Sequence, residues 1–370
     1  MYNLYLMKMG LASKVKILVF SSIILLGLTG LSRSQSIETN ASATVFDQVG
    51  KEVSKIFEKS KDSVIKVKSF IISQETDPKG TTLEATGFFI DDNGTILTTY
   101  SVLRGAESTW IEIGDKRYDA KVIGADPRSR VAMLKINYKS KAFLDIANSG
   151  NLEIGRAVLS IGYPYNLPSS PNFGFIGGFD TKYQENFFVT THIRANLPIS
   201  PGQAGSPLLT SDGKVVGMLV AGMEDGKACY ALPSNAIKKV KSDMEKYNGD
   251  VKHAWVGVNV IKAAPVADER TVVIRNLNPG TPAEQSGLQN GDVVLKIDNY
   301  NIREPKDVLD ASFYAKVGEP ITITVLRDGK KVESTVTLTT RPATSQSVEK
   351  LPTSLAPENF DKLQIGGKLP

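Results

Sequence analysis

Between residues 63 and 232 the chain is a succession of short β-forming runs that are separated by turn residues. Gly, Asn, Asp and Pro break the runs at fairly regular intervals. Short strands spaced in this way are typical of an antiparallel β-sandwich or β-barrel. We therefore predict a mainly β domain at 63–248, with strands at 64–70, 87–90, 95–99, 110–113, 132–136, 157–161, 187–193 and 215–220.

Two of the breaks, 91–94 and 211–213, contain Asn-Gly and Asp-Gly pairs. These pairs tolerate the positive φ that tight turns require, so they predict hairpin turns and not ligand sites. A helical pattern then runs from 234 to 247, and Ser234 or Asn235 is placed to cap it. We expect this helix to end the domain.

A chain of 370 residues is long enough for two domains. The second lies at 254–341, where the pattern predicts strands at 256–260, 271–275, 293–297, 321–327 and 332–338 and helices at 282–286 and 306–315. Beyond it, 342–370 is rich in Pro, Ser, Thr and Lys and predicts a flexible tail.

The first 34 residues contain four basic residues and no acid, and 17–31 is almost wholly apolar. This pattern predicts a cleavable export signal at 1–34, with an uncleaved membrane anchor as the alternative. Either way the remainder is exported, to the periplasm or the outside. An N-terminal segment at 35–62 follows, and 45–61 within it has the pattern of an amphipathic helix.

The charge and the metal-binding residues exclude several classes of function. The formal net charge is +5, of which the signal accounts for four, so 35–370 lacks the basic excess of a nucleic-acid-binding protein. A single cysteine, Cys229, forms no internal disulfide, and two histidines make no metal site of recognisable spacing. We expect no cofactor and no metal.

Five separated segments of the first domain resemble the HtrA/Deg branch of the chymotrypsin-like serine proteases, in order and in spacing. They are Ala-Thr-Gly-Phe-Phe-Ile at 85–90 with its hairpin to 99, Gly-Ala-Asp-Pro at 124–127 leading to 131–136, Ile-Gly-Tyr-Pro at 161–164, Pro-Gly-Gln-Ala-Gly-Ser-Pro-Leu at 201–208, and Tyr-Ala-Leu-Pro at 230–233. The resemblance implies a chymotrypsin-like double β-barrel.

The positions that match the catalytic triad of the family hold other residue types. Ser101 stands at the histidine position, Arg130 at the aspartate position and Ala204 at the nucleophile position. Acyl transfer needs a hydroxyl, an imidazole base and an orienting carboxylate, and none of these is present. The resemblance thus implies a degenerate triad, while the backbone N–H groups of Gly202 and Ala204 are expected to keep an oxyanion-hole-like arrangement.

A relocated active site is the alternative that must be tested. Ser206 as nucleophile and His192 as base is one pairing, against which Ser206 is interpreted as a small turn residue and His192 as a half-exposed strand histidine. His253 is expected to be a linker residue. Cys229 is expected to be a buried strand cysteine and not a reactive thiol.

The second domain resembles the PDZ domain that follows the protease in this family. The matching segments are Asn-Pro-Gly-Thr-Pro-Ala at 278–283, Ser-Gly-Leu at 286–288 and Asn-Gly-Asp-Val-Val-Leu-Lys-Ile at 290–297. Such domains add a peptide C-terminus as a strand and hold its carboxylate on loop amides. The resemblance implies peptide binding at Trp255, Val256, Gly257 and Val258, with helix residues from 307–313 setting side-chain preference.

These features predict an exported, catalytically inactive HtrA-like homologue that binds peptides or unfolded protein C-termini as a chaperone, scaffold or regulator. Two alternatives stay open. One is an active or atypical serine endopeptidase in envelope protein quality control. The other is a structural envelope component, trimeric as many relatives are or associated with an active relative, in which 45–61 packs between subunits.

Overall fold

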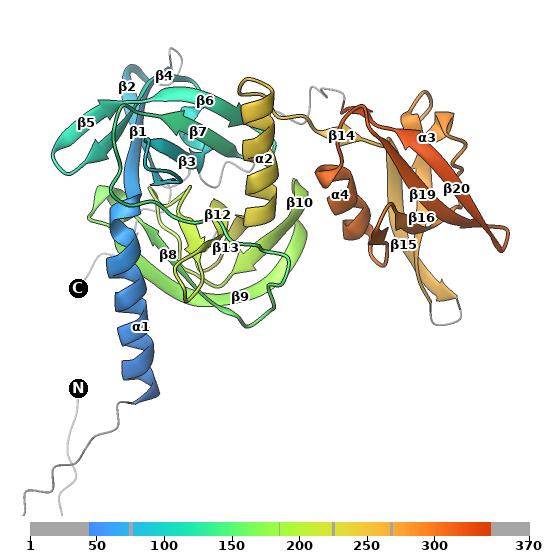
Figure 1. The fold of residues 1–370 in the computed structure, drawn as a ribbon, viewed down its shortest axis with the longest axis horizontal. Helices are drawn as coiled ribbons and strands as arrows, with labels where there is room; N and C mark the ends of the chain where they lie inside the picture. The colour runs from blue at the N-terminus through green and yellow to red at the C-terminus, as the bar shows by residue number, and fades with distance from the viewer. Residues whose placement is uncertain (1–43, 74–76, 185, 224–225, 267–268, 342–370) are drawn as a thin grey trace, which may run out of the picture. The chain divides into compact units, whose positions relative to one another are not determined.

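The computed structural model describes residues 44–73, 77–184, 186–223, 226–266 and 269–341. The described residues from Val45 onward belong to one compact unit. The predicted signal at 1–34 and the predicted tail at 342–370 lie outside the described residues. Figure 1 shows that strands dominate the described chain, with few helices among them.

The elements of the first domain follow one another from a long N-terminal helix to a second long helix. They are α1 (Val45–Ser60), η1 (Lys61–Ser63), β1 (Val64–Ser73), β2 (Asp77–Phe89), β3 (Thr95–Thr99), η2 (Tyr100–Leu103), β4 (Ala106–Ile113), β5 (Lys116–Asp119), β6 (Lys121–Asp126), β7 (Val131–Lys135), β8 (Ala157–Gly162), η3 (Pro164–Asn166), β9 (Ser170–Tyr183), β10 (Asn186–Ala195), β11 (Pro207–Leu209), β12 (Val215–Gly222), β13 (Cys229–Pro233) and α2 (Ser234–Lys246).

These strands form two antiparallel sheets. The first has seven strands in the order β5-β4-β1-β2-β3-β7-β6, and the second is a closed six-stranded barrel in the order β10-β13-β12-β11-β8-β9. The predicted mainly β, two-barrel architecture is confirmed, although only the second sheet is closed by its strand pairing. The central strands β3 and β12 are buried along their whole length, because other elements cover both of their faces.

One apolar core joins the two sheets. Phe88 and Leu97 from the first sheet meet Ile161 and Met218 from the second, and all four side chains are buried. Helix α2 completes this core, because Val240 and its apolar neighbours on the same face pack against β12 and β6. The two sheets and α2 therefore share one core.

The predicted hairpin turns are present, but the predicted helix cap is wrong. Gly94 and Gly213 have φ of 83° and 78°, as tight turns require. The residue that precedes α2 is Pro233, which has no side-chain cap. Ser234 Oγ donates instead to the Ala147 carbonyl at 3.0 Å, and Asn235 Oδ1 accepts from the backbone of 149. Both side chains tie α2 to the preceding loop.

The second domain contains β14 (Ala254–Trp255), β15 (Val258–Val266), β16 (Glu269–Leu277), α3 (Pro282–Gln285), β17 (Val293–Ile297), β18 (Tyr300–Asn301), α4 (Pro305–Tyr314), β19 (Pro320–Arg327), β20 (Lys330–Thr337) and β21 (Thr339–Thr340). It has its own apolar core, which includes Val272, Ile274 and Val325. The predicted single strand at 256–260 is wrong, because Gly257 has a φ of 85° and separates β14 from β15.

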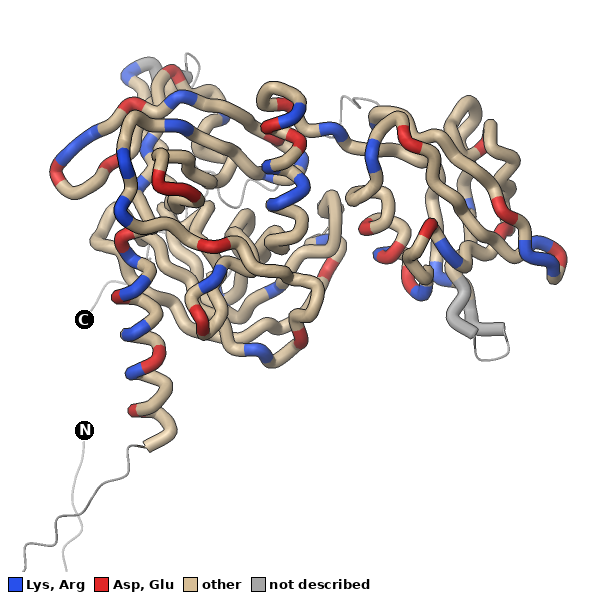
Figure 2. The backbone as a smooth tube through the Cα atoms, in the orientation of Figure 1, with Lys and Arg blue, Asp and Glu red and all other residues tan. Residues whose placement is uncertain are grey.

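Helix α1 occupies the predicted amphipathic segment. Its inner face is anchored by Ile56, which is 8% exposed, whereas Phe46 near its start is 87% exposed. Among the described residues, no helix is long and apolar enough to cross a membrane. Figure 2 shows basic and acidic residues interspersed along the backbone of both domains.

Candidate functional site

The turn before β11 is held in one conformation by its own hydrogen bonds and by those of β2. Gly202 and Gly205 have φ of 89° and 85°, which favour glycine. The Gln203 side chain accepts from Ser200 N at 2.9 Å, and Gln203 N donates to Ser200 O at 3.1 Å. Thr86 Oγ1 donates to Gly202 O at 2.8 Å. The turn is therefore fixed from both ends.

Two backbone donors of this turn have no partner among the described residues. The N–H groups of Gln203, Gly205 and Ser206 each donate to a backbone carbonyl, whereas those of Gly202 and Ala204 donate to none. Polar groups near the interior are normally paired, so two free N–H groups one residue apart are unusual. They are the donors that the sequence predicted for an oxyanion-hole-like pair, and that role stays a prediction.

The structure brings Ser101, Arg130 and Ala204 to the same end of β3. Ser101 Oγ lies 3.1 Å from Thr99 Oγ1 at that strand end. The backbone of Arg130 reaches it too, because its carbonyl accepts from Tyr100 N at 2.8 Å. The turn residue after Ala204 packs there as well, since a Cβ on Gly205 would lie 2.9 Å from Thr99 N. The three positions therefore gather at one end of β3, where it contacts β12 of the second sheet, and this place is referred to below as the cleft.

Arg130 carries an uncompensated positive charge into this cleft. Its guanidinium donates from Nη1 to the Val220 carbonyl at 3.3 Å. Burial lowers its pKa to about 10, so the side chain stays charged at neutral pH. Among the described residues, no carboxylate lies within ion-pair distance of the Arg130 guanidinium.

The two residues considered for a relocated active site are both enclosed. Ser206 is fully buried, and its Oγ has no hydrogen-bond partner in the described structure. His192 is 3% exposed, so the expectation of a half-exposed histidine is wrong. Its ring stacks on Phe188, and Nδ1 donates to Thr190 O at 2.8 Å. Burial, assisted by the charge of Arg130, lowers the pKa of His192 to about 3.

The burial of Cys229 and the placement of the described His, Cys, Asp and Glu side chains bear on a reactive thiol and on a metal site. Cys229 lies in β13, is fully buried, and burial raises the pKa of its thiol to about 12. A thiol in that environment is an apolar filler, as predicted. Within the described residues, no group of three His, Cys, Asp or Glu side chains is placed to hold a metal ion.

His253 has a partner that the sequence pattern did not predict. Its Nε2 lies 3.0 Å from a carboxylate oxygen of Asp126, which is 5% exposed at the end of β6. Burial alone would raise the pKa of Asp126, but the hydrogen bonds from His253 and Ser129 outweigh it and lower the pKa. The pair fixes the segment between α2 and β14 to the first sheet.

We expect this carboxylate to make stability depend on acid pH. An Asp whose pKa is lowered by folding contributes stability above its unfolded pKa, about 3.9, and that stability is lost as the pH falls through the folded pKa. The melting temperature should therefore drop more steeply below pH ~4 in the natural chain than in Asp126→Asn. Asp145→Asn, at an exposed position, is the control and should leave the pH profile unchanged.

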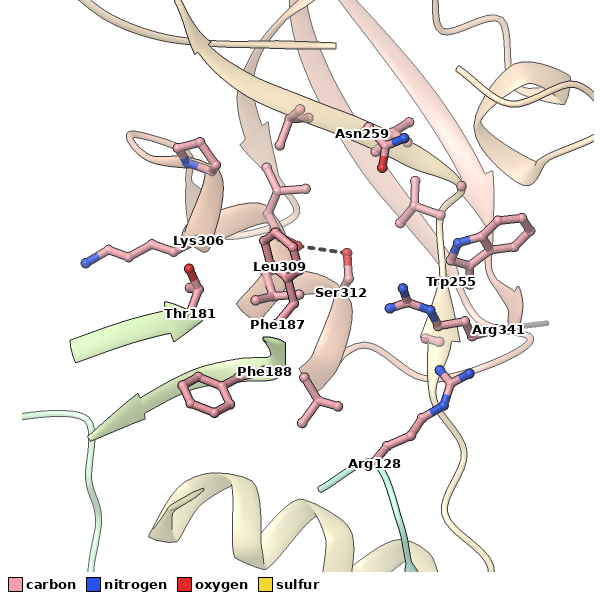
Figure 3. Close-up of a pocket in the computed structure, with 18 of the residues that line it drawn as sticks. Arg128, Thr181, Phe187, Phe188, Trp255, Asn259, Lys306, Leu309, Ser312 and Arg341 are labelled. Atoms are coloured by element: carbon pink, nitrogen blue, oxygen red, sulfur yellow. Dashed lines mark hydrogen bonds between the residues drawn. The ribbon is translucent and has the colours of Figure 1, made fainter. Parts of the chain in front are cut away.

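A cavity of about 590 Å³ lies beside the predicted peptide loop and is lined by residues of both domains. Figure 3 shows Asn259 on β15 opposite Leu309 and Ser312 on α4, with Phe188 of β10 below them and the Phe187 ring extending from β10 toward Leu309 in this view. All four loop residues line this cavity, namely Trp255, Val256, Gly257 and Val258. From the predicted helix segment 307–313, the lining residues are Val308, Leu309 and Ser312.

Helix α4 is held against β10 by one carboxylate. Asp310 Oδ1 accepts from Thr190 Oγ1 at 2.5 Å and from Thr191 N at 2.7 Å, and Oδ2 accepts from Thr191 Oγ1 at 2.7 Å. No sequence motif marked Asp310, since its partners lie about 120 positions away in the chain. One wall of the cavity is thereby attached to the barrel.

Family models match both domains in this order. A trypsin-like peptidase domain matches residues 85–218, and a PDZ domain matches residues 254–338. The chain belongs to the HtrA/Deg type of trypsin-like proteins with a PDZ domain.

Curated relatives and solved structures agree with this HtrA-type assignment. Two proteins named "Probable periplasmic serine endoprotease DegP-like", from Marinomonas sp. and Chlamydia muridarum, are 30% and 28% identical over 69% and 70% of this chain. The chain spans 57% and 55% of their lengths, that is, little more than half of each relative. The HtrA-type protease AlgW with tripeptide has a TM-score of 0.68 at 23% identity and covers 80% of this chain and 99% of its own.

Proposed function

We propose that this HtrA-type protein binds peptides and unfolded protein C-termini without hydrolysing them. The observation that carries the proposal is the side chain at the nucleophile position. Ala204 has no hydroxyl, and the nearest serine in the chain, Ser206, is fully buried beyond the turn. Without a hydroxyl at the nucleophile position, no acyl intermediate forms on the turn that carries the free N–H groups.

A general base is also missing from the positions that match the histidine and the aspartate of the triad. Ser101 and Arg130 face the cleft in place of an imidazole and a carboxylate, and neither takes up a proton near neutral pH. His192 is neutral, enclosed and bonded to a carbonyl. His253 Nε2 is hydrogen-bonded to the Asp126 carboxylate. A second function, active endopeptidase in envelope quality control, is favoured only by the names of the relatives.

Peptide capture is assigned to the PDZ domain. The Gly257 loop and α4 border an apolar cavity of the size that binds a short ligand segment. Solved relatives include AlgW with a tripeptide and with a decapeptide, which supports the same ligand class here. The relatives' names and the basic, apolar N-terminus support a periplasmic location for the mature chain.

Exchanging Gly257 for alanine should weaken binding of a C-terminal peptide at least roughly tenfold, because carboxylate capture depends on close backbone approach. Gly257 has a φ of 85°, and an added Cβ would lie 2.6 Å from Thr281 Cγ2. Gly280→Ala is the matched control, since Gly280 also has positive φ but its Cβ meets nothing within 4 Å. Fluorescence anisotropy with a labelled peptide measures both. Equal affinities would remove the peptide site from this loop.

A further inference from the structure

The cleft of the degenerate triad holds a charge that the fold does not neutralise. We propose that this cleft is a second binding site, which takes a carboxylate of a peptide on the Arg130 guanidinium and on the free N–H groups of Gly202 and Ala204. The site is separate from the PDZ cavity, so it goes beyond the proposed function and stands or falls independently of it.

Arg130 has more donors than the fold uses. A guanidinium presents five N–H donors in a fixed fork, and within the described part of the chain only Nη1 is bonded, to a neutral carbonyl at 3.3 Å. A partly buried cation without an anion is costly, whereas a carboxylate satisfies two of its donors at once. Arg327 of the second domain shows the usual solution, because its guanidinium donates to both carboxylate oxygens of the buried Asp292.

The backbone holds Arg130 in an uncommon conformation. Its φ is 61°, in the left-handed region that residues with a side chain rarely adopt. The hydrogen bond from Tyr100 N to Arg130 O fixes that conformation. Residues held in sparsely populated backbone conformations cluster at active sites and ligand-binding sites. Here the Arg130 side chain extends from the first sheet to the second, where its guanidinium donates to the Val220 carbonyl.

The guanidinium and the free N–H groups lie on adjoining structure. Val220, which accepts from Arg130, follows Leu219 in β12. Leu219 pairs with the turn on both sides, because its carbonyl accepts from Gly205 N and its N–H donates to Ser206 O. Arg130 is thereby anchored one residue from the strand position that holds the turn of Ala204.

Three of the groups at this place can be reached from solvent. Ser101, Arg130 and Gly202 are each partly exposed, and Ala204, which is 8% exposed, presents only a methyl group beside them. Backbone N–H groups and an arginine fork are both strong partners for a carboxylate, and neither depends on a catalytic side chain. The ligand class is therefore a peptide carboxylate, from the C-terminus or from an acidic side chain.

Selective ¹⁵N-glycine labelling tests the proposal, because Gly202 reports on the cleft and Gly257 on the PDZ loop in one sample. Four alanine-based hexapeptides are titrated into the purified protein: one with a free C-terminus, one amidated, one amidated with a central Asp, and one amidated with a central Asn. We expect the amide signal of Gly202 to move with the first or the third peptide and not with the second or the fourth. Which of the two moves it identifies the source of the carboxylate.

Arg130→Gln should weaken the response at Gly202 at least roughly tenfold, since a charge-assisted contact is lost, while the response at Gly257 stays unchanged. Arg156→Gln, at an exposed position before β8, is the matched control and should change neither. Ala204→Glu places an internal carboxylate beside the guanidinium and should abolish the response without removing Arg130. A Gly202 signal that no peptide moves, or that moves equally in the natural chain, Arg130→Gln and Ala204→Glu, overturns the proposal.

Discussion

Replacing Gly205 with alanine is expected to destabilise the first domain by about 2–5 kcal/mol, the sum of a left-handed backbone penalty and of overpacking. Gly205 has a φ of 85°. A Cβ there would collide with the Thr86 carbonyl and lie 2.9 Å from both Thr98 Oγ1 and Thr99 N. Two of these atoms belong to the backbone of β2 and β3, so they do not move aside without disturbing the central sheet.

Gly155 provides a control that separates the two contributions. Its φ is 87°, but a Cβ there meets nothing within 4 Å. Gly155→Ala should therefore cost only the backbone penalty, about 1–2 kcal/mol. Urea unfolding of the two variants beside the natural chain measures the difference. Equal losses would mean that the turn before β11 yields easily and does not hold the cleft in one conformation.

Restoring the three missing groups is expected to create a protease. The variant Ser101→His, Arg130→Asp, Ala204→Ser supplies base, orienting carboxylate and nucleophile around a turn that already has two free N–H donors. Asp tolerates the left-handed conformation at 130. Because a full triad contributes on the order of 10⁶-fold to kcat, we expect unfolded-casein hydrolysis at least roughly a hundredfold above the natural chain even with imperfect geometry.

The three single revertants are the controls for this gain. Each lacks two members of the triad, and triad members act as a unit, so each should stay near the activity of the natural chain. A triple variant that folds, shows the far-UV circular dichroism of the natural chain and still does not cleave would contradict the assignment of Ser101, Arg130 and Ala204 to the triad positions.

Turn chemistry and motif order made much of the fold predictable. The hairpins at Gly94 and Gly213, the strand runs that flank them and the helix after Pro233 all follow from local preferences of glycine, proline and β-branched residues. Motif order then indicated the HtrA-type arrangement of two domains. Local preferences were less useful for β9, where 14 residues with several glycines form one long strand because barrel closure requires it.

Burial and long-range pairing were beyond the sequence pattern. An alternating strand does not tell which face meets the core, so His192 was expected to be half exposed and is enclosed against Phe188. The contact of His253 with Asp126 joins positions 127 residues apart. The sequence marked Arg130 only as a residue of the wrong charge, whereas its lack of an anionic partner required the three-dimensional surroundings.

The most direct test of the central claim is hydrolysis by the natural chain itself. Purified protein is incubated with unfolded casein and with a C-terminal peptide, beside a covalent serine-hydrolase probe, and both cleavage and peptide retention are followed. We predict no cleavage, no covalent labelling and retention of the peptide through the PDZ domain. Cleavage that disappears in Ser206→Ala would contradict this prediction and would place an active site on the buried serine two residues beyond Ala204.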